Sequence, residues 1–146
     1  LALACDLRYC TDDSRFRMPA ARLGLGYARE GIHRMRDVLG SARTAELFMT
    51  ARTFDGLEAA RIGMVQEVFA RKEFEAMIAE RIAAVVSNAP LTIQAAKLAL
   101  RHLAGSSNAP SSDDVDTATR KCFFSQDYQE GQRSFRDKRP PLFQGR

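Results

Sequence analysis

Apolar and polar positions follow two different rhythms along this chain, and the change comes near residue 70. Before it, short apolar runs of strand length stand between turn residues and helical stretches, which is typical of a mixed α/β fold. After it, apolar residues recur three and four positions apart, which predicts amphipathic helices. These helices are predicted over residues 71–87, 91–103, 113–124 and 127–136. The pattern therefore divides the chain into an α/β part over residues 1–70 and a nearly all-helical part over residues 71–146.

The segment Arg52–Val68, RTFDGLEAARIGMVQEV, contains the clearest local structure in the sequence. Its pattern predicts a strand, a turn, a helix and a second strand. Asp55 can cap the helix, and Glu58 follows three residues later, which is the spacing of a capping box. Gly63 ends the helix, and the apolar residues after it predict a buried strand over residues 64–69.

Upstream of this segment, the sequence predicts two more strands and a broken helix. The strands cover residues 6–10 and 16–18, and turn residues separate them. Helical spacing then begins near Arg29 and stops at Gly40, and a further helix begins at Ser41.

Composition narrows the classes of protein that fit this chain. Its 146 residues are 45% hydrophobic and 27% charged, as in an ordinary globular domain. No window approaches the roughly 18 uninterrupted apolar residues that a membrane-spanning helix needs, so we expect no membrane partner. The net charge of +4 is mild, and basic residues are not interleaved with aromatic ones. Nucleic acid is therefore not an expected partner either.

Cysteine and histidine are placed unfavourably for a metal site or a nucleophile. Cys5 and Cys10 lie too far apart for a CxxC pair, and Cys122 has no second cysteine near it. His33 and His102 each stand alone in a helical stretch, without an adjacent Ser or Cys nucleophile. We therefore expect no metal, free thiols in a reducing compartment, and structural or surface roles for both histidines.

Three segments, taken in order, resemble the enoyl-CoA hydratase/isomerase family, also called the crotonase superfamily. They are RFRMPAARLGLGYAREG over residues 15–31, the segment 52–68, and SQDYQEGQRSFRDKRPPLFQG over residues 125–145. That family combines a strand ending near MP, an LGL loop, a helix of the EA…GLV type and an EG…F…KR.P.F.G tail. The resemblance implies that residues 1–70 form the later part of a crotonase ββα spiral. Residues 71–146 would then form a helical trimerisation region.

The resemblance also implies an acyl-CoA-processing enzyme. In the family, backbone N–H groups form an oxyanion hole that stabilises a thioester enolate, and these donors would lie upstream of Leu1. The chain is then expected to be the C-terminal half of a subunit, with an upstream segment in the native protein. The expected substrate is a coenzyme A thioester, with no separate cofactor, and the expected assembly is a homotrimer or a dimer of trimers. The expected compartment is the cytoplasm, or the mitochondrial matrix in a eukaryote.

The same resemblance assigns residues to an acyl pocket. It places Pro19, Ala20, Leu23 and Ala28 around that pocket, while Tyr27 either aims its hydroxyl into the pocket or packs against the loop. Hydratases of the family carry a catalytic glutamate at the position of Ala20. Alanine neither accepts a proton nor orients water, so the type of reaction stays open among hydration, isomerisation, decarboxylation and thioester hydrolysis.

Glu30 is the nearby acid that could replace the missing glutamate. Its functional interpretation is a displaced general acid or base, and its structural interpretation is a first-turn glutamate that the helix dipole favours. Lys138 matches a tail lysine that, in relatives, reaches the CoA nucleotide of a neighbouring subunit, and otherwise it is an exposed lysine. A second hypothesis remains, a catalytically silent binding or assembly subunit, which Ala20 and Ala28 both favour.

Overall fold

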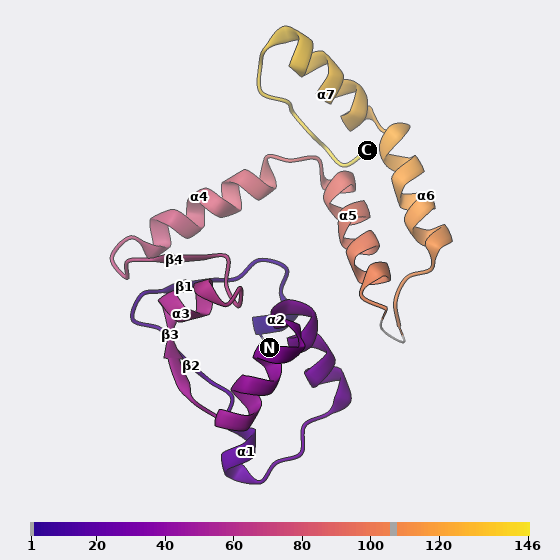
Figure 1. Ribbon diagram of the computed structural model, residues 1–146. Helices are drawn as coiled ribbons and strands as arrows, with labels where there is room; N and C mark the ends of the chain where they lie inside the picture. The colour runs from indigo at the N-terminus through magenta and orange to yellow at the C-terminus, as the bar shows by residue number, and fades with distance from the viewer. Residues whose placement is uncertain (1, 106–107) are drawn as a thin grey trace. The chain divides into compact units, whose positions relative to one another are not determined.

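The computed structural model describes residues 2–105 and 108–146, and it divides the chain into two compact units. The first unit ends at Ala79 and the second begins at Glu80. Strands occur only in the first unit among the described residues, and the second unit is helical (Figure 1).

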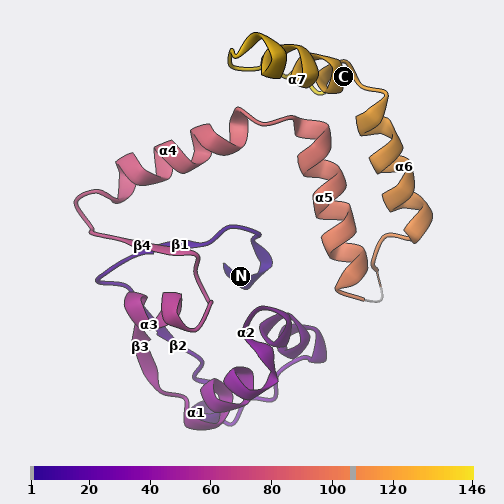
Figure 2. The same ribbon diagram turned by 45° about the horizontal axis from the view of Figure 1, so that its top comes forward.

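Two small sheets form the centre of the first unit. Strand β1 (Tyr9–Thr11) pairs in parallel with β4 (Glu67–Phe69). Strand β2 (Arg15–Arg17) pairs in antiparallel fashion with β3 (Thr53–Asp55), so each sheet joins segments that are about 40 to 60 residues apart in the sequence (Figure 2). The sheets are therefore tertiary structure, and their register depends on the chain between them.

Aromatic side chains and one arginine hold these strands together. The rings of Phe16 and Phe54, which face each other across β2 and β3, stack with centroids 5.6 Å apart. Arg8 donates from Nε to the Met64 carbonyl at 2.6 Å, and the backbone N–H of Gln66 donates to the Arg8 carbonyl at 2.9 Å. Met64 and Val65 form a bend rather than a strand, so the predicted strand over 64–69 is shortened to β4.

The helices of the first unit begin with η1, a 3-10 helix over Ala2–Ala4, and α1 (Ala20–Leu23). Helix α2 (Arg29–Thr50) then supplies much of the unit's packing surface. Its Gly40 has φ 74° and ψ 163°, which is not a helical conformation. The predicted break at this glycine is therefore confirmed, since two helical segments meet there at a kink.

Helix α3 (Gly56–Arg61) is capped as the sequence predicts, although only half of the capping box forms. The Asp55 side chain accepts a hydrogen bond from the Glu58 backbone N–H at 2.9 Å. The Glu58 carboxylate instead accepts hydrogen bonds from Arg52 and Arg61, which together lower its pKa to about 2, Arg61 having the larger effect. Glu58 therefore pairs with the two arginines instead of accepting the Asp55 backbone N–H that would complete a capping box.

The core of the first unit lies between α2, α3 and the strands. Its buried members are Cys10, Met35, Leu47, Phe54, Ala59 and Val65. Gly56 begins α3 directly against β1, because a Cβ there would lie 2.5 Å from the Thr11 carbonyl oxygen. Burial raises the pKa of the Cys10 thiol, which fits a packing role rather than a nucleophile.

Helix α4 (Phe74–Val86) leads from the first unit into the second, which contains α5 (Pro90–Leu103), α6 (Ser112–Phe123) and α7 (Gln126–Asp137). Helices α5 and α6 lie side by side and run in opposite directions (Figures 1 and 2). The predicted helices are confirmed within about three residues at each end, the largest shift being the start of α4. Within the described residues no single helix is long and apolar enough to cross a membrane, although the bent pair α4 and α5 passes that test together by length and composition.

Candidate functional site

An apolar hollow of about 300 Å³ lies in the first unit, where the chain leaves β2 and enters α2. Both segments of α2 contribute to its wall, together with α1 and the loop that follows α1. Its lining residues are Ala20, Ala21, Leu25, Tyr27, Ile32, Phe48 and Met49. The Tyr27 hydroxyl is the only oxygen or nitrogen atom in these seven side chains, so the hollow suits a hydrocarbon chain.

Tyr27 forms one wall of the hollow by packing on α2. Its ring meets the Phe48 ring edge-on, with centroids 5.3 Å apart. Gly31 leaves room for the ring, because a Cβ there would lie 2.5 Å from Tyr27 Cε1. The ring is half-exposed. Tyr27 is thus packed against α2 and also borders the hollow.

Ala20 is the buried member of the lining, with 4% of its surface exposed. It opens α1 directly after Pro19, and its carbonyl oxygen accepts hydrogen bonds from the backbone N–H groups of Gly24 and Leu25. These bonds close the LGL loop over the short helix, and Gly24 can take the left-handed φ of 66° that this requires. The side chain offered to the hollow at this point is a methyl group.

The remaining residues predicted for the acyl pocket lie elsewhere. Pro19, Leu23 and Ala28 are exposed and do not line the hollow, Leu23 with 64% of its surface in solvent. The structure therefore brings Ala20 and Tyr27 together and leaves these three outside.

Phe48 and Met49 are wall residues that the sequence analysis did not assign to the pocket. They lie about 20 residues beyond Tyr27 in the chain, after the Gly40 kink. Their apolar helical spacing was the available signal. Such spacing indicates that one side of a helix is apolar, but it does not identify the residues that this side contacts.

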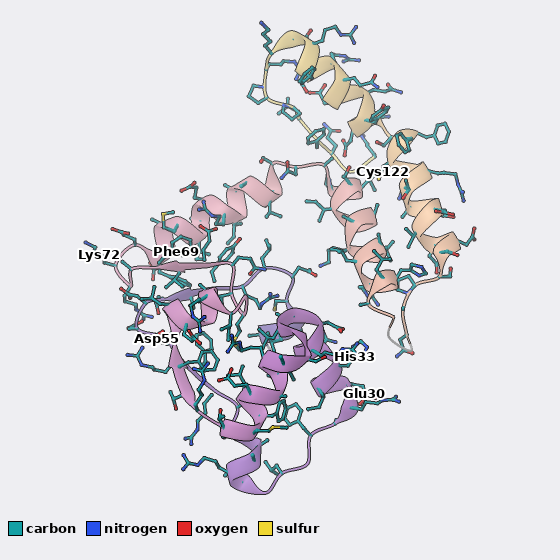
Figure 3. All side chains as sticks on the ribbon, in the orientation of Figure 1. Glu30, His33, Asp55, Phe69, Lys72 and Cys122 are labelled. Carbon is teal, nitrogen blue, oxygen red and sulfur yellow. The ribbon has the colours of Figure 1, made fainter. Side chains whose placement is uncertain are left out.

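Glu30 lies in the first turn of α2 and outside the hollow. Its side chain is 73% exposed, pairs with Arg29 at 3.4 Å and points away from the strands (Figure 3). A hydrogen bond from its own backbone N–H and the neighbouring Arg29 lower its pKa. Glu30 is therefore a carboxylate at neutral pH, so it is not in the protonated form that a general acid needs.

His33 has a partner that the sequence analysis missed. Its Nδ1 lies 2.7 Å from Oδ2 of Asp37, one helical turn further along, and Arg36 lies 3.1 Å from its Nε2. His33 lies on the same outer side of α2 as Glu30 (Figure 3). The i,i+4 spacing of His33 and Asp37 was the available signal for this pair, which fits the structural or surface role expected of His33. Within the described residues, no group of three or more potential metal ligands occurs.

A larger apolar cavity, about 730 Å³, lies in the second unit among α5, α6 and α7. Small side chains of α5, such as Ala95 and Ala99, form one wall, and Phe123 and Tyr128 form another. Cys122 and Phe143 also border it. Cys122 is a partly exposed free thiol (Figure 3).

Lys138 lies directly after α7 in a left-handed conformation, with φ 53° and ψ 40°. The backbone N–H of Arg139 donates to the Ser134 carbonyl at 3.1 Å, and that of Lys138 donates to the Phe135 carbonyl at 3.3 Å. This pair of bonds is a Schellman motif, in which glycine is the usual residue at the left-handed position. The side chain of Lys138 is exposed.

The family model described as enoyl-CoA hydratase/isomerase matches residues 1–146 of this chain. The chain belongs to this family. The match confirms the resemblance carried by the three sequence segments.

Similar proteins of known name fit the same assignment. The probable enoyl-CoA hydratase 2, mitochondrial, of Arabidopsis thaliana is 30% identical over 145 residues, which are 99% of this chain and 48% of that protein. The carnitinyl-CoA dehydratase of Escherichia coli O157:H7 is 32% identical over 150 residues, covering 100% of this chain and 58% of that protein. The chain thus spans about half the length of the curated relatives that it matches.

Solved structures confirm the crotonase-type α/β fold. An enoyl-CoA hydratase/carnithine racemase from Magnetospirillum magneticum superimposes with a TM-score of 0.89 at 26% identity, over 99% of this chain and 53% of that one. A probable enoyl-CoA hydratase/isomerase from Mycobacterium abscessus superimposes with a TM-score of 0.80 at 28% identity, over 99% of this chain and 56% of that one.

Proposed function

We propose that this chain is the C-terminal part of an acyl-CoA-processing enzyme of the enoyl-CoA hydratase/isomerase type. The observation that carries this proposal is the family match along all 146 residues. The apolar hollow of the first unit, which suits an acyl chain, supports it. The substrate is a coenzyme A thioester, and no separate cofactor takes part. The enzyme works in the cytoplasm, or in the mitochondrial matrix if its source is a eukaryote.

The chemistry of this proposal needs donors that stabilise negative charge on the thioester oxygen. Two backbone N–H groups aimed at that oxygen would lower the barrier to enolate formation, since preorganised donors are usually the largest single contribution to such catalysis. We place both donors upstream of Leu1. The residues of the hollow then bind and orient the acyl chain.

The acid–base step is assigned to Glu30. Ala20 presents only a methyl group, so two glutamates cannot share one water in this pocket. Glu30 is an ionised carboxylate in the segment between Tyr27 and Ile32, both of which line the hollow. A carboxylate base can remove a proton from the attacking water in hydration or a carbon-bound proton in isomerisation, so the assignment of Glu30 does not identify a single reaction.

CoA binding is assigned to Lys138, whose ammonium group reaches the nucleotide part of CoA on a neighbouring subunit of a homotrimer or a dimer of trimers. Lysine occupies a left-handed position where glycine is the usual residue. A side chain other than glycine's at such a strained position points to a function for it.

The test is turnover by the intact protein with a set of enoyl-CoA and acyl-CoA thioesters, followed by absorbance and by mass spectrometry of the products. Wild-type protein should convert at least one thioester, and Glu30→Gln should lower kcat. An intact mass measured beforehand establishes whether residues upstream of Leu1 are present. No turnover of any thioester by a protein that carries those residues would contradict the proposal.

A catalytically silent binding or assembly subunit is the second candidate, because Ala20 and Ala28 are both inert in acid–base chemistry. A silent subunit should still gain thermal stability from acyl-CoA, since a ligand that binds only the folded state raises the melting temperature. Binding without turnover across several thioesters would favour this candidate over the enzyme.

A further inference from the structure

The chain after Lys138 returns along α7 without regular secondary structure and is held there by two carboxylates of that helix. We call residues 140–146 the C-terminal strap. Glu130 makes the first attachment. Its Oε1 and Oε2 accept hydrogen bonds from Arg139 Nη1 and Nη2 at 2.6 and 2.9 Å, and Oε1 also accepts one from the Leu142 backbone N–H at 3.0 Å. Arg139, and then the backbone of Leu142, lower the pKa of Glu130 to about 2.

Asp127 makes the second attachment. Its Oδ1 accepts from the Gln144 backbone N–H at 2.7 Å, and its Oδ2 accepts from the Gly145 backbone N–H at 2.8 Å. Its own backbone N–H donates to the Arg146 carbonyl at 3.1 Å, and the residue is 4% exposed. Hydrogen bonds to a charged group are stronger than neutral ones, so these contacts compensate for the absence of a strand or helix.

These attachments fix the turn at Lys138 from both sides. The Schellman bonds join the turn to the end of α7. Glu130 accepts hydrogen bonds from Arg139, which directly follows Lys138, and from the Leu142 backbone. Arg139 is thereby occupied by a carboxylate, whereas Lys138 is exposed. Arg139, the basic neighbour of Lys138 in the sequence, is thus paired, and the backbone that follows Lys138 is attached to α7.

We propose that Glu130 and Asp127 are positioning residues for Lys138. They hold the strap so that the left-handed turn stays closed and the lysine is presented to the nucleotide part of CoA in one place. This inference rests on the proposed function of Lys138. A positioned charge binds more tightly than a mobile one because less side-chain and loop ordering remains to be lost on binding.

The test is a double-mutant cycle on the intact protein, with the dissociation constant of CoA measured by calorimetry. Glu130→Gln should weaken binding by about three- to tenfold, and Lys138→Ala by about tenfold. The double variant should bind no more weakly than Lys138→Ala, because Glu130 acts through Lys138. In turnover assays Glu130→Gln should raise KM and leave kcat unchanged. Hydrogen exchange of the peptide 138–146 should become faster in that variant.

Glu58→Gln is the matched control. It removes a glutamate that is held between arginines and has the same pKa of about 2, but this glutamate lies in the first unit. It should leave the CoA affinity as in the wild type. Arg139→Lys replaces Glu130→Gln if the latter does not fold, since a lysine keeps the charge and loses the two-bond geometry.

The possible outcomes separate the two proposals. An unchanged affinity in Glu130→Gln, beside a weakened one in Lys138→Ala, would overturn the positioning role and leave the CoA role of Lys138 intact. Additive losses in the double variant would also overturn it. An unchanged affinity in Lys138→Ala would overturn both, because there would be no binding lysine to position. Weakened, non-additive binding with faster exchange of the strap would support the inference.

Discussion

Lys138→Gly should separate the strain of the tail turn from its function. The lysine has φ 53° in the left-handed region, which costs a non-glycine residue about 1–2 kcal/mol. Glycine has no such penalty but loses more backbone freedom on folding, about 0.5–1 kcal/mol. Both Lys138→Gly and Lys138→Ala lose the favourable interaction of the lysine charge with the C-terminal end of α7, so that loss cancels between them. The glycine variant should therefore be more stable than the alanine variant by about 0.5–1 kcal/mol.

The two variants should lose CoA affinity equally, because each removes the ammonium group. Lys138 is exposed, so the loss should lie near the lower end for a hydrogen bond to a charged group, about 1.5 kcal/mol or roughly tenfold in the dissociation constant. Urea denaturation measures the stability difference, and calorimetry measures the affinity. Equal stability of the two variants would refute the strain argument, and affinities equal to that of the wild type would refute the binding role.

Three further perturbations test other parts of the structure. Gly56→Ala should destabilise the protein by about 1–3 kcal/mol and lower its melting temperature, because the new methyl group would lie 2.5 Å from a backbone carbonyl oxygen of β1. The control is Leu57→Ala, at a position that is 66% exposed, which should change the stability by less than about 0.5 kcal/mol. Glu30→Gln should lower kcat by about 100-fold or more if Glu30 is the base, and unchanged turnover would eliminate that role. Acid should destabilise the fold as the pH falls from about 4.5 towards 2, because the folded-state pKa values of Glu58 and Glu130 are lowered to about 2. The stability that these two carboxylates contribute is complete above the ordinary glutamate pKa of 4.5 and is lost as the pH falls through that window. In chemical denaturation at a series of pH values, a Glu58→Gln/Glu130→Gln variant should lose less stability over the same window than the wild type.

Features that depend on a few neighbouring residues were predictable from the sequence. The helix start at Asp55 and the kink at Gly40 belong to this class, because a side-chain cap and a left-handed glycine are local properties. The helices of the second unit followed from apolar spacing alone. The short helix α1 was missed, because four residues bounded by Pro19 and Gly24 give too little periodicity to detect.

Features that join distant segments were not predictable in the same way. The hollow combines Tyr27 with Phe48, and only the folded chain shows that these rings meet. The left-handed turn at Lys138 could not be predicted, because the position carries no glycine. The hydrogen bond from the Leu142 backbone to Glu130 joins residues 12 positions apart, which no local pattern indicates. The family resemblance supplied the roles of Ala20 and Lys138, which no periodicity could have indicated.

The two candidate functions differ in where charge can be stabilised. A hollow whose side chains offer one hydroxyl group and otherwise hydrocarbon or thioether surface can hold an acyl chain, but it cannot stabilise an enolate, since an uncompensated charge in apolar surroundings is costly. Glu30, outside that wall, is itself negative and cannot be the group that stabilises an oxyanion. Affinity for an acyl-CoA therefore cannot distinguish an enzyme from a silent subunit, since both can bind the ligand, whereas only an enzyme has a measurable kcat.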